Sequence, residues 1–106
     1  MKYIKKYENV EEPQVGDYVL MRTDSKNIDY RNFLKNNVGQ IIEMESDFHM
    51  SVKYENVPIK FIKMGLFVWS SVEQEYYHTF NKRKMLVFSD NPNDLELKFQ
   101  MRKYNL

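Results

Sequence analysis

The sequence predicts a mainly β (α+β) domain: a small antiparallel barrel of about five strands, with a short helix in its first long loop and a C-terminal helix. Short segments with alternating apolar and polar residues recur along the chain, and turn-forming residues separate them. Aromatic residues make up 15% of the chain, and large rings suit the core of a small barrel. The 106 residues fit one domain over 1–106, with the barrel at about 13–89 and the C-terminal helix at about 92–103.

The first strand is predicted within residues 15–22, where a turn leads into an alternating segment. Val19 and Met21 would face one side of the sheet, and Leu20 the other. The alternation predicts that one of these sets enters the core.

A short helix is predicted between residues 24 and 37. Asp29 can cap its start, and Asn36 and Asn37 are suitable residues to end it. The side chains that would share its apolar face are Tyr30, Phe33 and Leu34.

The second and third strands are predicted at residues 38–44 and 50–54, as an antiparallel pair. Asp47 marks the turn between them, and Asn56 and Pro58 end the third strand.

The apolar segment at residues 59–69 fits a helical face poorly, and residues 66–69 could instead form a strand at the edge of the sheet. The fourth strand is predicted at residues 76–80 and the fifth at 85–88, with a basic turn at 82–84 between them.

The C-terminal helix is predicted from its start signal. Asn91 can cap, Pro92 fits the first helical position, and Asp94 favours the positive end of a helix. The apolar residues that follow alternate with a period of two, which favours a strand instead. These residues are Leu95, Leu97, Phe99 and Met101. We favour the helix because its start signal has a physical mechanism.

Three segments carry a resemblance to a known fold. Residues 16–21 (GDYVLM) are similar to the opening of SH3-like barrels, and residues 38–43 (VGQIIE) resemble the glycine-bearing strand of KOW/Tudor-type modules. Residues 50–54 are similar to the strand that pairs with it. The resemblance implies an SH3-like barrel in which residues 24–37 and 59–75 are insertions, free for recognition. None of the RNA-binding residues of those modules is carried over.

In style, the whole chain resembles small lysine- and asparagine-rich proteins of large phages and viruses, including its ending at residues 103–106 (KYNL). This resemblance implies a small protein that binds and modulates a host or viral protein in the host cytoplasm.

Composition narrows the function classes. Cysteine is absent, which removes disulfides, zinc–thiolate sites and thiol nucleophiles and agrees with a reducing cytoplasm. No secretory signal and no apolar segment of membrane-spanning length is evident, so we expect a cytoplasmic protein that does not enter a membrane. The net charge of +1 provides no long-range attraction to nucleic acid.

Catalysis and metal binding are not expected. His49 and His78 are the two histidines, and no cluster of residues with ligand spacing accompanies either of them. We therefore predict no catalytic residue, no metal, no cofactor and no small-molecule substrate.

A protein partner is the favoured prediction, because the chain is nearly neutral, rich in aromatic residues and interrupted by an apolar insertion. The single tryptophan, Trp69, lies in that insertion and is either an exposed anchor or a core residue. The predicted protein-binding residues are Phe67, Trp69, Tyr76 and Tyr77.

Nucleic-acid binding is the alternative. Cations near exposed rings can bind the phosphates and stack on the bases of single-stranded RNA or DNA. The predicted nucleic-acid-binding residues are Lys60, Lys63, Lys82, Arg83 and Lys84. A solvated turn beside ordinary core aromatic residues would give the same pattern, and the neutral net charge favours that interpretation.

Overall fold

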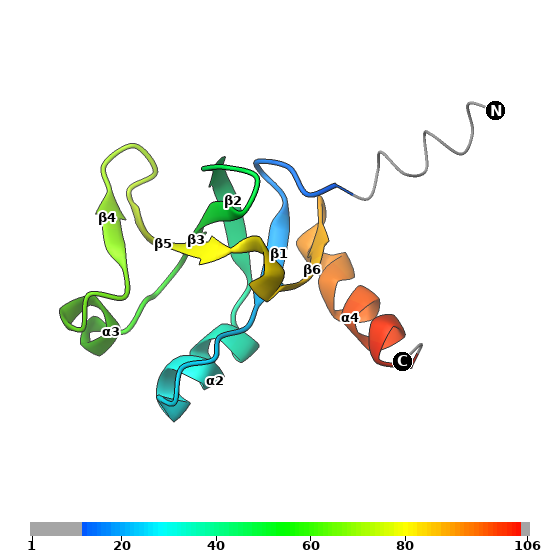
Figure 1. Cartoon of the computed structure of the whole chain (residues 1–106), viewed down its shortest axis with the longest axis horizontal. Helices are drawn as coiled ribbons and strands as arrows, with labels where there is room; N and C mark the ends of the chain where they lie inside the picture. Colours follow the sequence, from blue (N-terminus) through cyan, green and yellow to red (C-terminus); the bar gives the residue numbers. More distant parts are fainter. Residues whose placement is uncertain (1–11, 105–106) are drawn as a thin grey trace.

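The structure is a computed structural model that describes residues 12–104. Its main feature is one six-stranded antiparallel sheet, accompanied by three α-helices (Figure 1). The strands are β1 (Tyr18–Met21), β2 (Gly39–Met44), β3 (His49–Tyr54), β4 (Val68–Ser70), β5 (Glu75–Asn81) and β6 (Met85–Ser89). The helices are α2 (Ile28–Asn36), α3 (Ile59–Lys63) and α4 (Leu95–Tyr104), with short 3₁₀ turns η1 (Lys82–Lys84) and η2 (Pro92–Asp94). The α+β class and the mainly β character are confirmed.

The order of the strands requires the sheet to curl. It is β4-β5-β3-β2-β1-β6, so three strands lie between β5 and β6. A flat sheet with strands about 4.8 Å apart would separate β5 from β6 by about 19 Å. The chain leaves β5 at Asn81 and enters β6 at Met85, and so short a connection spans at most about 14 Å. The sheet is therefore curved, although its two edges, β4 and β6, do not pair with each other.

The predicted strands occur in the predicted order. β2 pairs with β3 and β1 pairs with β6, each antiparallel. Val19 and Met21 face the core, whereas Leu20 faces the other side, as their alternation predicts. The sixth strand, β4, is an addition to the predicted five and pairs only with β5.

Gly39, at the start of β2, is closely approached by side chains of β3. A Cβ atom at this position would lie 2.3 Å from Cγ1 of Val52 and 2.8 Å from Cζ of Tyr54. Glycine is therefore needed at the start of β2 so that β3 can present a large ring beside it.

An aromatic cluster forms the centre of the core on one face of the sheet. Tyr30 of α2 contacts Phe61 of α3 edge-on, with ring centroids 5.6 Å apart. Phe67 lies against Tyr30 at 6.1 Å and against Tyr54 at 5.9 Å. The two insertions therefore supply core residues, which corrects the expectation that they are wholly free for recognition: only their outward-facing side chains, such as Arg31 and Trp69, are exposed.

The helix starts follow from capping chemistry. Asn27, and not the predicted Asp29, caps α2, because its side chain accepts a hydrogen bond from the backbone N–H of Tyr30. Asn91 caps η2 and leads into α4, with Pro92 at the start, as predicted. The segment at residues 59–69, which the sequence left open, contains the short helix α3 and the start of β4.

Candidate functional site

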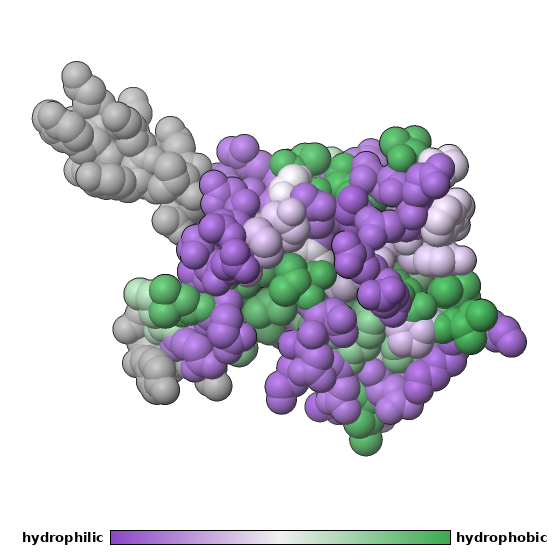
Figure 2. Space-filling view, turned by 180° about the vertical axis from the view of Figure 1, so that it is seen from behind, coloured by the Kyte–Doolittle hydropathy of each residue, from purple (hydrophilic) through white to green (hydrophobic). Residues whose placement is uncertain are grey.

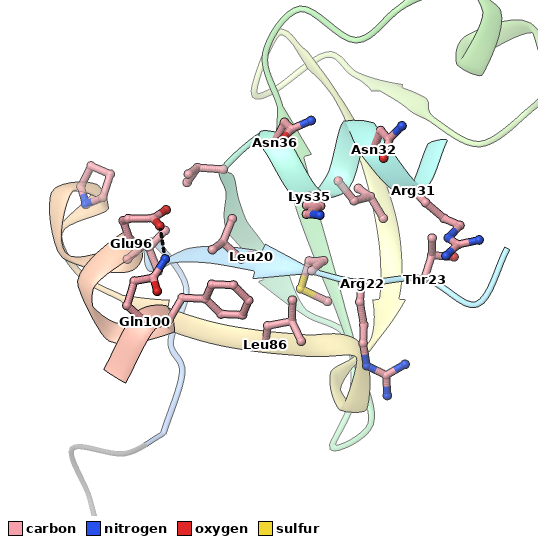
Figure 3. Close-up of a pocket in the computed structure, with 16 residues that line it drawn as sticks. Leu20, Arg22, Thr23, Arg31, Asn32, Lys35, Asn36, Leu86, Glu96 and Gln100 are labelled. Carbon is pink, nitrogen blue, oxygen red and sulfur yellow. Dashed lines mark hydrogen bonds between the residues drawn. The ribbon is translucent and has the colours of Figure 1, made fainter. Parts of the chain in front are cut away.

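A groove lies between α2 and α4. It encloses about 740 Å³ and passes over β1 and β6 (Figure 3). This volume is in the range of ligand-binding clefts. The apolar residues that line it are Leu20, Met21, Leu34, Val38, Leu86, Pro92, Leu95 and Phe99. The polar and charged ones are Arg22, Thr23, Arg31, Asn32, Lys35, Asn36, Glu96 and Gln100.

The floor of the groove is built by residue spacing in two strands and one helix. Leu20 lies on the face of β1 opposite to the core residues Val19 and Met21, so it is half-buried and faces α4. On α4, Leu95 and Phe99 are four residues apart and share the helix face that packs on β6 and β1. Leu95 is buried, whereas Phe99 and Leu86 are half-buried. The floor is thus lined by apolar side chains.

The α2 wall of the groove is positively charged. Arg31 and Lys35 lie one helical turn apart, next to the buried residues Tyr30 and Leu34. Both cations are exposed, and neither forms an ion pair with any residue that the structure describes. Their charges therefore remain available to a ligand.

The opposite wall has one carboxylate. Glu96 of α4 accepts a hydrogen bond from Nε2 of Gln100 at 2.8 Å, drawn as a dashed line in Figure 3. Arg22, at the end of β1, is 3.2 Å from Asp24, which also pairs with Lys84. Because Asp24 holds two cations, the pKa of its carboxyl group lies below its usual value, chiefly through the hydrogen bond from Lys84. The groove keeps an excess of positive charge.

The four predicted protein-binding aromatic residues do not share one surface. Phe67 is only 3% exposed and belongs to the core, so it is no surface anchor. Trp69 is 51% exposed and lies on the edge strand β4, where its ring contacts Tyr76 at a centroid distance of 5.0 Å. Tyr76 packs against the core, and Tyr77 is on the opposite face of β5.

Exposed apolar side chains occur in several parts of the described chain. In Figure 2, hydrophobic surface shows in several places and hydrophilic side chains separate them. At the end of the molecule near Trp69, the exposed apolar residues are Ile59, Met64, Val68 and Val72. Exposed apolar residues are common on protein surfaces.

The predicted nucleic-acid-binding cations are also divided. Lys60 forms an ion pair with Asp29 at 2.7 Å, and Lys84 pairs with Asp24. Lys63 is at the end of α3, whereas η1 carries Lys82 and the exposed Arg83, and Figure 1 places α3 and the end of β5 well apart. The structure does not bring these five residues into one basic groove.

His78 is half-buried among aromatic residues. Its Nδ1 lies 2.6 Å from the backbone oxygen of Leu66, and its ring contacts Phe80 at a centroid distance of 4.5 Å. Burial lowers the pKa of this imidazole, and the contact with the Leu66 oxygen opposes the shift. These contacts give His78 a structural role between β5 and the loop before β4.

The sequence interpretation missed the groove, although two local signals point to it. The pairs Arg31–Lys35 and Leu95–Phe99 each have the spacing of four residues that places both members on one helix face. Their juxtaposition across β1 depends on the fold and has no signature in the sequence.

No family model, curated protein or solved structure matches this chain. Within residues 12–104, no helix is long and apolar enough to cross a bilayer. Nor do the described residues contain a group of three or more histidine and acidic side chains that could hold a metal ion.

Proposed function

We propose that this chain is a non-catalytic binding module that holds a segment of a protein partner in the groove between α2 and α4. The observation that carries the proposal is a groove with an apolar floor beside two cations that form no ion pair with any described residue. Recognition of proteins commonly combines apolar anchoring with a polar or charged rim.

The apolar floor would supply the affinity. Leu20, Leu86 and Phe99 are half-buried and Val38 is 42% exposed, so a ligand side chain can remove further apolar surface from water. Each buried methylene group contributes about 0.8 kcal/mol. Several apolar side chains buried in the groove can therefore offset the free energy that association costs through lost translational and rotational freedom.

As a finer assignment of the fold, we propose that the curled sheet is an SH3-like barrel. The support is the order β5-β3-β2-β1-β6, in which β2, β3 and β5 form a meander, together with the short η1 connection between β5 and β6. Nuclear Overhauser contacts between the start of β6 and the end of β5 would test whether the curvature approaches closure.

The exposed edge at Trp69 is a second place where a protein could bind. Trp69 contacts Tyr76, and Val68 beside it is 55% exposed. β4 and β6 are the two opposite edges of the sheet, and the groove lies beside β6, so one short ligand would not cover both places. We favour the groove because it is concave and its floor is built from two strands and one helix.

Binding of single-stranded nucleic acid is the alternative function. The unpaired Arg31 and Lys35 favour it, since both side chains bind phosphate as well as carboxylate. It predicts retention on single-stranded RNA or DNA that falls steeply with added salt.

A displayed library of random peptides tests the protein-binding proposal. We expect the wild-type domain to enrich peptides that Val38→Asp no longer retains, because this change puts a carboxylate at the apolar side of the groove. Ile28→Asp is the matched control, since Ile28 is 65% exposed and does not line the groove. The backbone amides of Leu20, Val38 and Phe99 should shift in NMR spectra when an enriched peptide binds.

Two results would overturn this proposal. The first is a library that enriches no peptide over the Val38→Asp variant. The second is a set of shifts centred on Trp69 and Tyr76, which would move the binding surface to β4.

A further inference from the structure

We infer that the partner segment for this groove is acidic and amphipathic, with apolar side chains on one face and carboxylates beside them. This inference rests on the proposed protein-binding function and adds the chemistry of the partner.

The charge on the two walls is unequal. Arg31 and Lys35 face the groove from α2 with no ion pair inside the described part of the chain, and Arg22 adds a third cation that shares Asp24. Among the described residues that line the groove, Glu96 has the only carboxylate, and it accepts a hydrogen bond from Gln100. A ligand with carboxylates along one side would meet the α2 wall with opposite charge.

The spacing within α2 supports the same conclusion. Like charges four residues apart on a helix destabilise it slightly. The single acid of α2, Asp29, is already paired with Lys60 and cannot offset the Arg31–Lys35 pair. A bound carboxylate between these two side chains would remove their repulsion and add two charge-assisted hydrogen bonds.

The floor requires the ligand to be apolar as well. Leu20, Leu86 and Phe99 offer one aromatic ring among aliphatic side chains, and the polar groups are at the rim. Single-stranded nucleic acid binds where several rings are open to stack on bases, and this floor does not provide them. The combination of aliphatic floor and basic wall therefore fits an acidic protein segment better than a phosphate backbone.

The test uses two fluorescent peptides that share the same leucines at the spacing of one helix face. One carries glutamate at the remaining charged positions, and the other carries lysine. By fluorescence anisotropy we expect the glutamate peptide to bind at least about tenfold more tightly, a difference of about 1.4 kcal/mol.

Charge reversal in the protein provides the decisive comparison. Arg31→Glu and Lys35→Glu should each weaken binding of the glutamate peptide by about fivefold, and the double variant should prefer the lysine peptide. Lys26→Glu is the control, because Lys26 is equally exposed and does not line the groove. Lys26→Glu should leave the affinities for both peptides unchanged. A cooperative thermal unfolding transition would verify that each variant is folded.

The outcomes separate the two claims. If the lysine peptide binds as tightly as the glutamate peptide and Val38→Asp abolishes both, the groove binds proteins and the acidic preference is wrong. If neither peptide binds and the displayed library also fails, the protein-binding function itself is wrong. If single-stranded DNA binds and Arg31→Glu or Lys35→Glu abolishes that binding, the ligand is nucleic acid and the inference is overturned.

Discussion

Tyr54 has a hydroxyl group that is buried in the aromatic core and forms no hydrogen bond with the described residues. Burial raises the pKa of this hydroxyl well above its usual value. An unpaired buried hydroxyl costs free energy in the folded state, because water solvates it in the unfolded chain.

We therefore expect Tyr54→Phe to stabilise the protein by roughly 1 kcal/mol, measured as the free energy of unfolding in urea. The ring and its contacts with Phe33 and Phe67 stay in place. Tyr77→Phe, on the opposite face of the sheet, is the control and should change little. A loss of stability in Tyr54→Phe would instead mean that a buried water molecule satisfies the hydroxyl.

At the scale of elements, the segment that leads into β4 divides sharply between core and surface. Phe67 and Trp69 are two residues apart, yet the first is 3% exposed and the second 51% exposed. Phe67→Ala should destabilise the protein by about 3–5 kcal/mol, as expected for a buried aromatic residue. Trp69→Ala should cost less than about 1 kcal/mol, since its ring contacts chiefly Tyr76 on the neighbouring edge.

Urea denaturation of the two variants measures this difference directly. Equal losses of stability would contradict the assignment of Trp69 to the surface. Equal losses would also mean that Trp69 is needed for folding and is not accessible to a partner.

Elements with a strong local signal could be predicted from the sequence. α4 was predicted correctly because Asn91 and Pro92 start a helix by a physical mechanism. The alternation that argued for a strand there also contains the helical spacing of four. Leu95 and Phe99 turn inward at that spacing, and Leu97 and Met101 stay exposed.

Elements that depend on distant contacts could not be predicted. α3 has five residues and no side-chain cap, so little in its sequence marks it, and it is held by Phe61 packing on Tyr30 and Phe33. The N-cap of α2 was placed two residues late, at Asp29, because Asn27 can cap equally well and the sequence does not decide between them.

At the scale of the whole molecule, the groove follows from curvature of the sheet. Leu20 and Leu86 are far apart in the sequence and come together only because β6 pairs with β1. The short connection between β5 and β6 requires this curvature. Composition and local residue spacing do not predict which distant segments come together. The richness in aromatic residues therefore predicted a binding surface at Trp69 and not between α2 and α4.

The buried titratable groups also determine how stability of the whole molecule depends on pH. Burial lowers the pKa of His78, so below its ordinary value of 6.5 the unfolded chain binds a proton that the folded chain resists. The contribution of neutral His78 to the free energy of unfolding is fully present above pH 6.5, and it is lost as the pH falls through the lowered pKa. In the alkaline range, burial raises the pKa of Tyr30 to about 12, so stability falls as pH rises above 10.0, where the unfolded tyrosine ionises.

Urea denaturation at about pH 5 and about pH 7.5 would therefore show lower stability at the acid value, where an unperturbed histidine is charged. His78→Gln should reduce this difference, because glutamine does not titrate and its amide can still donate to the Leu66 oxygen. His49→Gln is the matched control for replacing an imidazole by an amide, since His49 is exposed at the start of β3. If His78→Gln keeps the full loss of stability at the acid value, His78 does not control it. The Asp24 carboxyl, whose pKa is lowered chiefly by its hydrogen bond with Lys84, would reduce stability only below its ordinary value of 3.8.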